Sequence, residues 1–392
     1  MSATATTFSA SQLPIVCHSH LRWDFVWQRP QQVLARLADR HRVAFVEEPI
    51  TDAAATRLEI SEPTCNVVRV VPHVRGPGGD VDAQCSQLRP LLQRALREHP
   101  LCTGRFGRVI QWFYSPMVAP GFLGSFDTAT VVYDCMDELS KFRFAPKDLE
   151  QREVTLLSAA DIVFAGGHRL STRKSRQHPN VHFYGCGVDV DHYARSRDAA
   201  TALPADVAAL PHPMLGYFGV VDERLDYSLI DELARAFAHG SIVIVGPLAK
   251  VDRENLPTHR NLHWLGQRTY QELPAYVKAF DACLMPFALN DATEYINPTK
   301  ALEYMAAGKP VISTAVPDVI RNFAPVAQVA RSHAEFIALA ARACAAPDAA
   351  LLAAGLELAR EATWESVVAA MRARMLEAVR ARSAATSPAL PS

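Results

Sequence analysis

The sequence lacks the features that mark membrane-spanning, secreted and nucleic-acid-binding proteins. Its 40 Lys and Arg residues nearly balance 41 Asp and Glu residues, for a net charge of −1, so no nucleic-acid partner is indicated. No apolar run approaches the roughly 18 residues that a membrane span needs. Residues 1–12 lack the basic region and apolar core of a secretory signal. These absences predict a cytoplasmic protein.

Cysteine motifs and glycine motifs are also missing. The eight cysteines form no C-x-x-C pair and no His/Cys ligand spacing, which predicts reduced, mostly buried thiols and no metal site. No G-x-G-x-x-G follows the first expected strand, which argues against a dinucleotide site there. No internal repeat of 20–50 residues is present.

What the sequence does have is alternation of short apolar strands with amphipathic helices. At 392 residues, 49% hydrophobic and 21% charged, two globular domains are expected. The chain opens with strand 14–17, helix 31–39 and strand 43–46, a βαβ unit that implies a parallel sheet. A second βα series begins at strand 214–218. We therefore expect an α/β protein with two domains facing across a cleft.

The expected boundaries follow from composition. Residues 1–195 form a first domain, 196–213 an Ala/Asp/Pro-rich linker, 214–363 a second domain, and 383–392 a disordered tail. A basic amphipathic helix is expected over 364–382. A Gly/Pro-rich turn is expected at 76–79.

Polar clusters follow several strands of the first half. In open α/β sheets, ligands bind beyond the carboxyl ends of the strands. His18, His20, Trp27 and Arg29 follow strand one and suit a polyhydroxylated or anionic ligand, although the tryptophans could instead plug the base of the domain. After strand 130–133 come two carboxylates, Asp134 and Asp137, which could orient an acceptor hydroxyl; capping a helix is the competing role for Asp137.

The stretch 297–314 predicts a capped helix and a buried strand. Asn297 suits the N-cap and Pro298 the first helical position, while Gly308 is placed as a C-cap. Lys300 lies in the first turn, where it opposes the helix dipole, so an external anion is the expected compensation. Glu303 lies four residues after Thr299 and could accept hydrogen bonds from sugar hydroxyls. The alternative is an ordinary amphipathic helix with solvated charges.

The loop after strand 214–218 also suits an anion. Gly219 permits close approach of the backbone, and Arg224 follows in the same loop. One Arg, one Lys and exposed N–H groups match the charge of a diphosphate. Alternatively, Arg224 pairs with Asp222 or Asp226.

Six pieces of the chain together resemble one enzyme family. They are 27–32 (WQRPQQ), 160–165 (ADIVFA), 187–189 (GVD), 216–219 (GYFG), 245–247 (VGP) and 297–314. The chain resembles GT-B glycosyltransferases of the large retaining family 4 type (group 1), in a branch similar to enzymes of bacterial surface-polysaccharide and teichuronic acid synthesis. The resemblance covers about residues 13–380 and implies two Rossmann-like domains, with the helix after Trp364 crossing back to the first.

The resemblance also implies roles for single residues. Arg224 and Lys300 would hold the pyrophosphate of a nucleotide sugar, with the backbone at Gly219 and the helix start at 297–299 (Asn297, Pro298, Thr299). Glu303 would bind the ribose. Gln267 and Arg268 would lie along the nucleobase, and the first domain would hold the acceptor. Asp137, from its place after a strand and not from the resemblance, is a candidate catalytic carboxylate.

The reaction that this implies is retaining and metal-independent, with a nucleotide sugar, UDP-sugar by family frequency, as co-substrate and no other cofactor. The D-x-D spacing of Asp189 and Asp191 falls where the family has a structural turn. The acceptor would be a saccharide or lipid-linked, and a lipid-linked acceptor would bring peripheral contact with the inner face of the cell membrane.

The chain departs from the family at one position. A glutamate usually stands eight residues before Glu303; here that position is Tyr295, and Glu294 or Asn297 would substitute for it. The departure keeps two other functions open: an inactive nucleotide-sugar-binding partner protein, and a sugar-nucleotide epimerase on the same fold.

Overall fold

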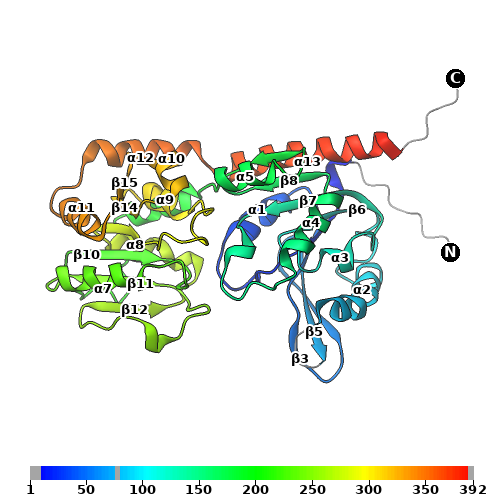
Figure 1. Ribbon diagram of the computed structural model, residues 1–392, viewed down its shortest axis with the longest axis horizontal. Coiled ribbons are helices and arrows are strands. Elements are labelled where there is room, and N and C mark those ends of the chain that lie inside the picture. The colour runs from blue at the N-terminus through cyan, green and yellow to red at the C-terminus, as the bar shows by residue number, and fades with distance from the viewer. Residues whose placement is uncertain (1–9, 76–79, 387–392) are drawn as a thin grey trace.

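The protein contains two mainly parallel β-sheets side by side, each flanked by helices (Figure 1). The structure is a computed structural model that describes residues 10–75 and 80–386. Within them, the first sheet has the strand order β3-β5-β2-β1-β6-β7-β8-β9, with β4 antiparallel to β5, and the second has the order β12-β11-β10-β13-β14-β15. This is the predicted α/β architecture.

The first half supplies the larger sheet. Its strands are β1 (Ile15–His18), β2 (Val43–Val46), β3 (Ile50–Ala53), β4 (Arg57–Thr64), β5 (Val67–Arg75), β6 (Val109–Phe113), β7 (Thr128–Cys135), β8 (Ile162–Ala165) and β9 (Val181–Phe183). Its helices are α1 (Arg29–Leu37), α2 (Val81–Glu98), α3 (Ala119–Phe122), α4 (Leu149–Ala159) and α5 (His168–Lys174). The next helix, α6 (Val190–Ala194), packs against the second half, and its Tyr193 is buried in that half's core.

The second half supplies the smaller sheet and the closing helices. Its strands are β10 (Met214–Phe218), β11 (Ser241–Val245), β12 (Leu262–Gly266), β13 (Ala282–Met285), β14 (Val311–Thr314) and β15 (Ala327–Ala330). Its helices are α7 (Tyr227–Ala236), α8 (Leu273–Ala279), α9 (Lys300–Ala306), α10 (Pro317–Phe323), α11 (His333–Ala345), α12 (Ala349–Glu361) and α13 (Trp364–Thr386).

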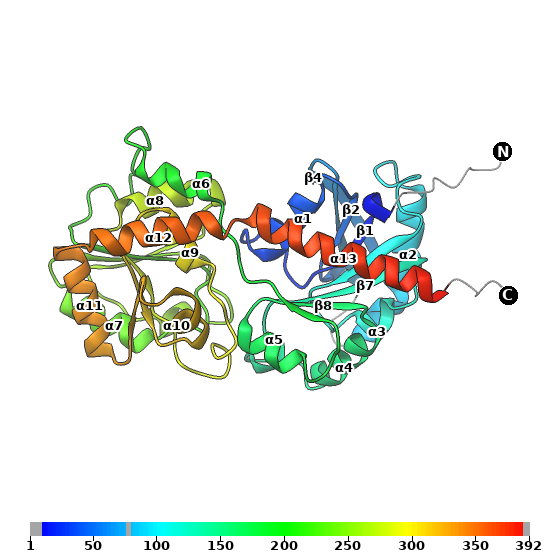
Figure 2. The ribbon, with the colours of Figure 1, turned by 90° about the horizontal axis from the view of Figure 1, so that it is seen from above.

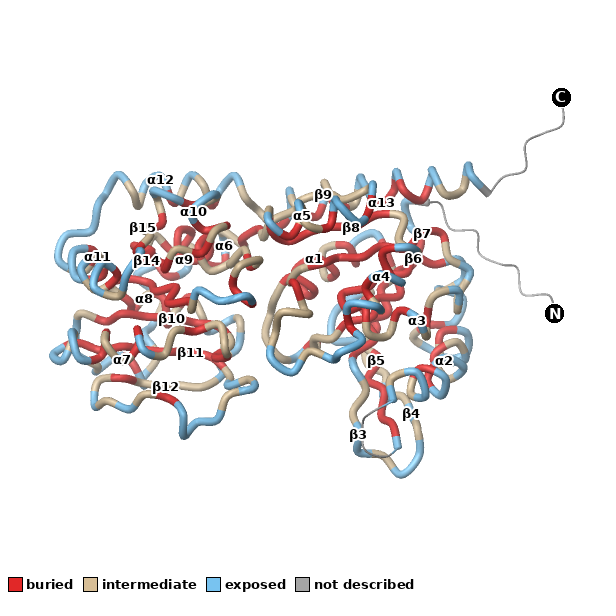
Figure 3. Tube along the Cα trace, viewed as in Figure 1, coloured by how far each residue is buried: buried red, intermediate tan, exposed pale blue. Residues whose placement is uncertain are grey.

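The central strands are buried on both faces. Every residue of β1, β2, β6 and β8 is buried, as is every residue of β10, β11, β13 and β14 (Figure 3). Continuous apolar strands of this kind are typical of parallel sheets covered by helices. In each sheet the first strand of the βα series lies between two parallel neighbours, so its carboxyl end is a topological switch point.

Helix α13 crosses from the second half to the first (Figure 2). Trp364, Met371 and Met375 are buried in the core of the first half. The crossing is fixed where Val188 bridges Thr363 and accepts the Trp364 N–H. A Cβ at Gly187 would lie 2.5 Å from the Trp364 nitrogen, so only glycine fits there.

Several elements differ from the sequence-based expectations. Helix α2 begins at Val81, where Asp80 caps it, and it accommodates Pro90 in its interior. Helix α12 was not predicted, since its alanine-rich sequence gives no clear apolar stripe. The predicted tail is wrong over residues 383–386, which belong to α13. The rest of the tail and the turn at 76–79 lie outside the described residues.

All eight cysteines lie in the described ranges, and each is unpaired. Along the described part of the chain, no single helix meets the length and hydropathy of a membrane span; α11 and α12 meet them only jointly, with a 98° bend between them.

Candidate active site in the cleft between the two sheets

A cleft of about 350 Å³ lies between the two halves and is lined by residues of both. The first half contributes the loop after β1 and residues just after β7. The second half contributes the loops after β10, β11 and β12 and the start of α9, and Trp364 closes one side. The cleft therefore lies at the carboxyl ends of both sheets, where α/β proteins bind their ligands.

Lys300 is a half-buried cation without an ionic partner among the described residues. It lies against Gly219, where an added Cβ would come within 2.2 Å of the lysine Cε. Its Nζ lies 5.6 Å from the centre of the Phe218 ring. Among the described residues its ammonium makes no hydrogen bond or ion pair, and burial lowers its pKa, although the nearby Glu303 opposes that shift. An unpaired ammonium facing a cleft is a place for an anion.

Arg224 also lines the cleft, and it pairs with Asp222. Its Nε lies 3.0 Å from both carboxylate oxygens of Asp222, and its Nη2 lies 2.7 Å from Oδ2. The guanidinium carbon lies 5.6 Å from the centre of the Phe142 ring. The pairing that the sequence left as an alternative is therefore present, but it engages only two of the three guanidinium nitrogens.

The start of α9 differs from the prediction. Asn297 is not the N-cap: Thr299 holds that position without a side-chain hydrogen bond, and the helix begins at Lys300. The Asn297 side chain donates instead to the carbonyl of Gly166 in the first half, 3.1 Å away, and accepts from Asn322. Because its amide joins the two halves, it cannot turn back to cap the helix.

Other predictions for the stretch 297–314 agree with the structure. Asn297, Pro298 and Thr299 all line the cleft. Gly308 ends the helix with a left-handed φ of +72°, as expected of a C-cap glycine. The N–H groups of Ala301 and Leu302 donate within the turn, so the Lys300 ammonium is the main positive feature here.

Two carboxylates line the cleft from opposite halves. Glu303 lies one turn after Lys300 and is buried, which raises its pKa while Lys300 opposes the rise. Asp137 lies after β7, and burial raises its pKa while Arg224 opposes the rise. The competing prediction that Asp137 caps a helix is wrong, because the short helix that follows has Glu138 at its N-cap position.

Glu138 holds the Asp137 segment in place. It accepts a hydrogen bond from Lys174, 3.1 Å away, and forms an ion pair with Arg173. Lys174 is fully buried and also bonds Glu153 at 2.7 Å. This buried network fixes the backbone beside Asp137.

The loop after β1 forms the first-half wall of the cleft. Gln31 organises it by donating to the carbonyls of Arg22, Trp23 and Val26 and accepting from the Gln28 N–H, at 3.0–3.1 Å.

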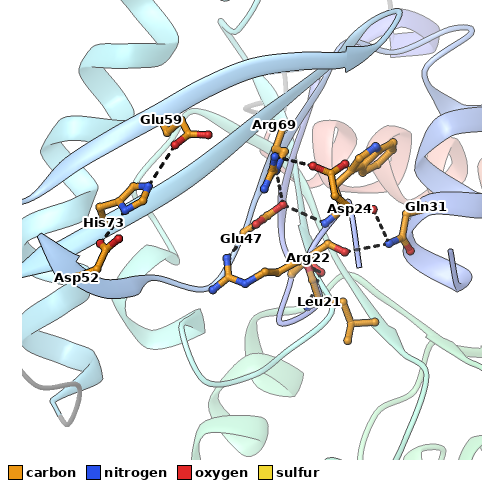
Figure 4. Close-up of polar contacts among 11 residues, drawn as sticks. Leu21, Arg22, Asp24, Gln31, Glu47, Asp52, Glu59, Arg69 and His73 are labelled. Carbon is orange, nitrogen blue, oxygen red and sulfur yellow. Dashed lines mark hydrogen bonds and ion pairs between the residues drawn. The ribbon is translucent and has the colours of Figure 1, made fainter. Parts of the chain in front are cut away.

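Buried Glu47 anchors the same loop. Figure 4 shows Glu47 accepting from Arg22 and Arg69, with Arg69 also reaching Asp24. Glu47 also accepts the Trp23 N–H at 3.0 Å. These contacts hold the loop against the sheet at its β2–β5 side.

The tryptophans of this loop divide between the two alternatives. Trp23 is 4% exposed and packs on Phe45, so it belongs to the core. Trp27 lines the cleft, with its ring 6.0 Å from that of Tyr270 in the second half.

Arg29 and Asp134 form a buried ion pair. Arg29 Nη2 lies 2.9 Å from Asp134 Oδ1, and neither side chain is more than 2% exposed. Arg29 also donates to the carbonyls of Tyr184 and Gly185. The prediction that Asp134 contacts an acceptor is wrong, because its side chain points into the core; Arg29 borders the cleft but is committed to this pair.

Three further predicted residues lie elsewhere than expected. Glu294 does not line the cleft and instead pairs with Arg169 of the first half, 2.5 Å away. His18 and His20 line a second, smaller cavity beside α2. Glu294 is held by its ion pair with Arg169, and the His18 ring is held by stacking on Phe113 and Phe122.

The predicted nucleobase residues both border the cleft. Gln267 donates to the carbonyl of Phe25 across the cleft. Arg268 pairs with Asp206 at 2.7 Å and bonds Tyr276 at 2.6 Å, so its guanidinium faces away from the opening. Tyr270 is a cleft residue that the sequence reasoning missed; the only signal was its position just beyond Gly266.

The described residues contain no cluster of three or more His, Cys, Asp or Glu side chains arranged to hold a metal ion. Asp189, the first residue of the D-x-D spacing, caps α6 by accepting the His192 N–H at 3.0 Å. That spacing is therefore a structural turn, as expected.

Comparison with known proteins finds similarity to glycosyltransferases. Residues 212–346 match the family described as glycosyl transferases group 1. The putative teichuronic acid biosynthesis glycosyltransferase TuaH of Bacillus subtilis (strain 168) is 25% identical over 313 residues, covering 68% of this chain and 77% of that protein.

Solved structures show the same fold. The sucrose-phosphate synthase of Thermosynechococcus elongatus superposes with a TM-score of 0.68 at 15% identity, covering 96% of this chain and all of that one. An E. coli structure described as trehalose-6-phosphate bound with UDP-2-fluoro glucose gives a TM-score of 0.64 at 12% identity, covering 93% and 99%.

The class of the protein follows: it is a glycosyltransferase with the GT-B fold. Its second half carries a group 1 glycosyltransferase domain over residues 212–346. The family resemblance, the fold class and the transferase activity expected from the sequence are thereby confirmed.

Proposed function

We propose that the protein transfers a sugar from a nucleoside-diphosphate sugar, with UDP as the preferred nucleotide, to a saccharide or lipid-linked acceptor. The observation that carries this proposal is the half-buried Lys300 ammonium, which has no ionic partner among the described residues and lines the cleft together with Arg224. Two cationic side chains suit the two charges that a diphosphate leaving group develops.

In this mechanism each charged side chain has one task. Lys300 and the free edge of Arg224 stabilise the departing diphosphate, and cationic side chains rather than a metal neutralise it. Glu303 accepts hydrogen bonds from the ribose. Asp137, from the opposite wall, orients the acceptor hydroxyl. Retention of the anomeric configuration is part of the proposal and rests on the family resemblance.

The biological setting is also a proposal. The name of the Bacillus relative refers to teichuronic acid biosynthesis, which supports a role in cell-surface polysaccharide synthesis. The bound UDP-2-fluoro glucose of the E. coli structure supports UDP. A lipid-linked acceptor would bring the enzyme to the inner face of the cell membrane.

The cleft composition argues against the epimerase alternative. That chemistry needs a set of carboxylates and histidines, and no histidine lines the cleft within the described residues. The inactive-partner alternative is favoured by one observation: Glu294 is committed to Arg169, so neither it nor Tyr295 supplies the family's usual carboxylate.

Thermal unfolding with UDP, GDP and dTDP tests nucleotide binding first. A ligand at a hundred times its Kd stabilises the folded state by about 2.7 kcal/mol. We expect UDP, the preferred nucleotide of the proposal, to raise the midpoint of unfolding most. Incubation with radiolabelled UDP-sugars then separates a catalyst, which releases free sugar slowly to water, from a binding partner, which does not. No stabilisation by any of the three nucleotides would refute the proposal.

A further inference from the structure

A glycine at the start of α5 packs against the second half. A Cβ added at Gly167 would lie 2.8 Å from Asp318 Oδ2, 2.9 Å from the carbonyl oxygen of Tyr295 and 3.7 Å from the Cβ of Asn297. All three atoms belong to the second half, so the missing side chain lets the two halves approach here. The φ of Gly167 is −133°, an extended value that any residue adopts. Alanine at this position would therefore disturb the contact between the halves and not the local backbone.

A carboxylate of the second half caps α5. Asp318, in the first turn of α10, is 1% exposed, and its Oδ2 accepts the His168 N–H at 2.6 Å. Gly167 is the N-cap residue of α5 and has no side chain that could do this. The first N–H group of α5 is thus satisfied from the other half. Figure 2 shows α5 at the side of the first half that faces the second half.

The loop 294–299 of the second half has one side in the cleft and the other on the first half. Its last four residues line the cleft, and it ends where α9 begins. On its other side, Glu294 pairs with Arg169, and the Asn297 side chain donates to the carbonyl of Gly166. The loop that leads to the cleft lysine is therefore fastened to the segment that includes the start of α5.

Helix α5 continues this connection to the opposite wall of the cleft. The guanidinium carbon of Arg173 lies 5.8 Å from the centre of the Tyr295 ring. The same guanidinium forms an ion pair with Glu138 at 3.0 Å, and Glu138 is the neighbour of Asp137 in the chain. Helix α5 thus lies between the loop that leads to Lys300 and the segment that carries Asp137.

We propose that Asp318 and Gly167 are positioning residues for the transfer. By holding the loop 294–299 against α5, they fix Asp137 of one wall relative to Lys300 of the other. Neither Asp318 nor Gly167 borders the cleft, so their effect on the reaction passes through this contact. The inference rests on the proposed function, in which the two cleft side chains orient the acceptor and hold the diphosphate.

The first test is Gly167→Ala. The assay is UDP release to water from UDP-glucose, UDP-galactose or UDP-N-acetylglucosamine, whichever the wild type hydrolyses fastest. Misplacing reacting groups by about 1 Å costs a factor of about 100, so we expect kcat to fall roughly 10- to 100-fold. The proposed UDP contacts all lie in the second half, so the Kd for UDP in calorimetry should stay within about threefold. Gly107→Ala, also in the first half, is the matched control: its added Cβ meets no atom within 4 Å, and it should keep kcat.

Variants of Asp318 separate positioning from folding. Asp318→Ala removes the cap of α5 and should lower kcat in the same way as Gly167→Ala. Asp318→Asn keeps an oxygen for the His168 N–H and should retain kcat within about threefold. Asp348→Ala removes a cap inside the second half, where Asp348 accepts two N–H groups at the start of α12, and should leave kcat unchanged.

Hydrogen exchange of residues 166–174 reports the contact itself without any ligand. It should be faster in Gly167→Ala and Asp318→Ala than in the wild type, and unchanged exchange in both would overturn the inference. If either variant folds, exchanges faster and keeps its kcat, the contact is only structural and the inference is wrong. If the wild type binds no UDP and releases none from the three UDP-sugars, the proposed function itself is wrong.

Discussion

Replacing Lys300 with methionine removes the cleft ammonium and keeps most of the side chain's hydrocarbon. At about 4 Å and an effective dielectric of about 20, one ammonium contributes roughly 4 kcal/mol to a phosphate charge. Loss of one preorganised donor in comparable sites costs about 3–4 kcal/mol. We therefore expect Lys300→Met to lower the kcat for UDP release from a UDP-sugar by a factor of roughly 100 to 1,000.

Folding should be unaffected or improved by this change. Burial lowers the pKa of Lys300 below its ordinary 10.5, so between the two pKa values the unfolded chain binds more protons than the folded one. The free energy of unfolding of the wild type therefore rises with pH in that window. In Lys300→Met the free energy of unfolding should rise less over the same window. Chemical denaturation at several pH values measures it.

Lys309 provides the matched control in the same half. It is also half-buried and has its pKa lowered by desolvation, but its Nζ donates to the carbonyls of Lys278 and Phe280 at 3.0 and 2.6 Å. Lys309→Met should cost about 1–3 kcal/mol of stability and keep kcat. If Lys300→Met retains kcat within threefold, or if both variants lose activity equally, the assignment of Lys300 is wrong.

Three further predictions address other parts of the account. Gly219→Ala should weaken UDP binding at least tenfold in calorimetry, because the added Cβ would displace Lys300. Gly266→Ala is the control: with a φ of +74° and open space around it, it should cost only about 1–2 kcal/mol of stability. Equal UDP affinities of the two variants would contradict this. Asp134→Asn should cost about 3–5 kcal/mol in denaturant unfolding by leaving its buried arginine partner uncompensated, and a neutral effect would restore the acceptor role. Gln31→Glu replaces three donated hydrogen bonds with repulsive contacts, so a loss of about 2–3 kcal/mol is expected; unchanged stability would show that this side chain does not hold the loop after β1.

Local signals in the sequence were sufficient for most of the fold. The apolar run at 311–314 and the glycine and proline that precede it defined β14 and the end of α9. Helix α12 was not predicted, because alanine on most of its faces leaves no distinct apolar stripe in the sequence. Residues 364–382 showed their amphipathic pattern and lie within α13.

The site was less predictable, because burial depends on register. Asp134 and Asp137 follow one another closely after a strand, yet β7 continues to Cys135, so Asp134 points into the core while Asp137 borders the cleft. No local pattern distinguishes them. Glu294 likewise forms an ion pair with Arg169, which lies 125 residues away in the chain and is brought near only by the fold.

The most direct test of the account is a crystal structure of the protein with UDP. We predict that the diphosphate lies in the cleft within hydrogen-bond distance of Lys300 Nζ and beside the Arg224 guanidinium. A diphosphate bound elsewhere, with Lys300 still unpaired, would contradict the account.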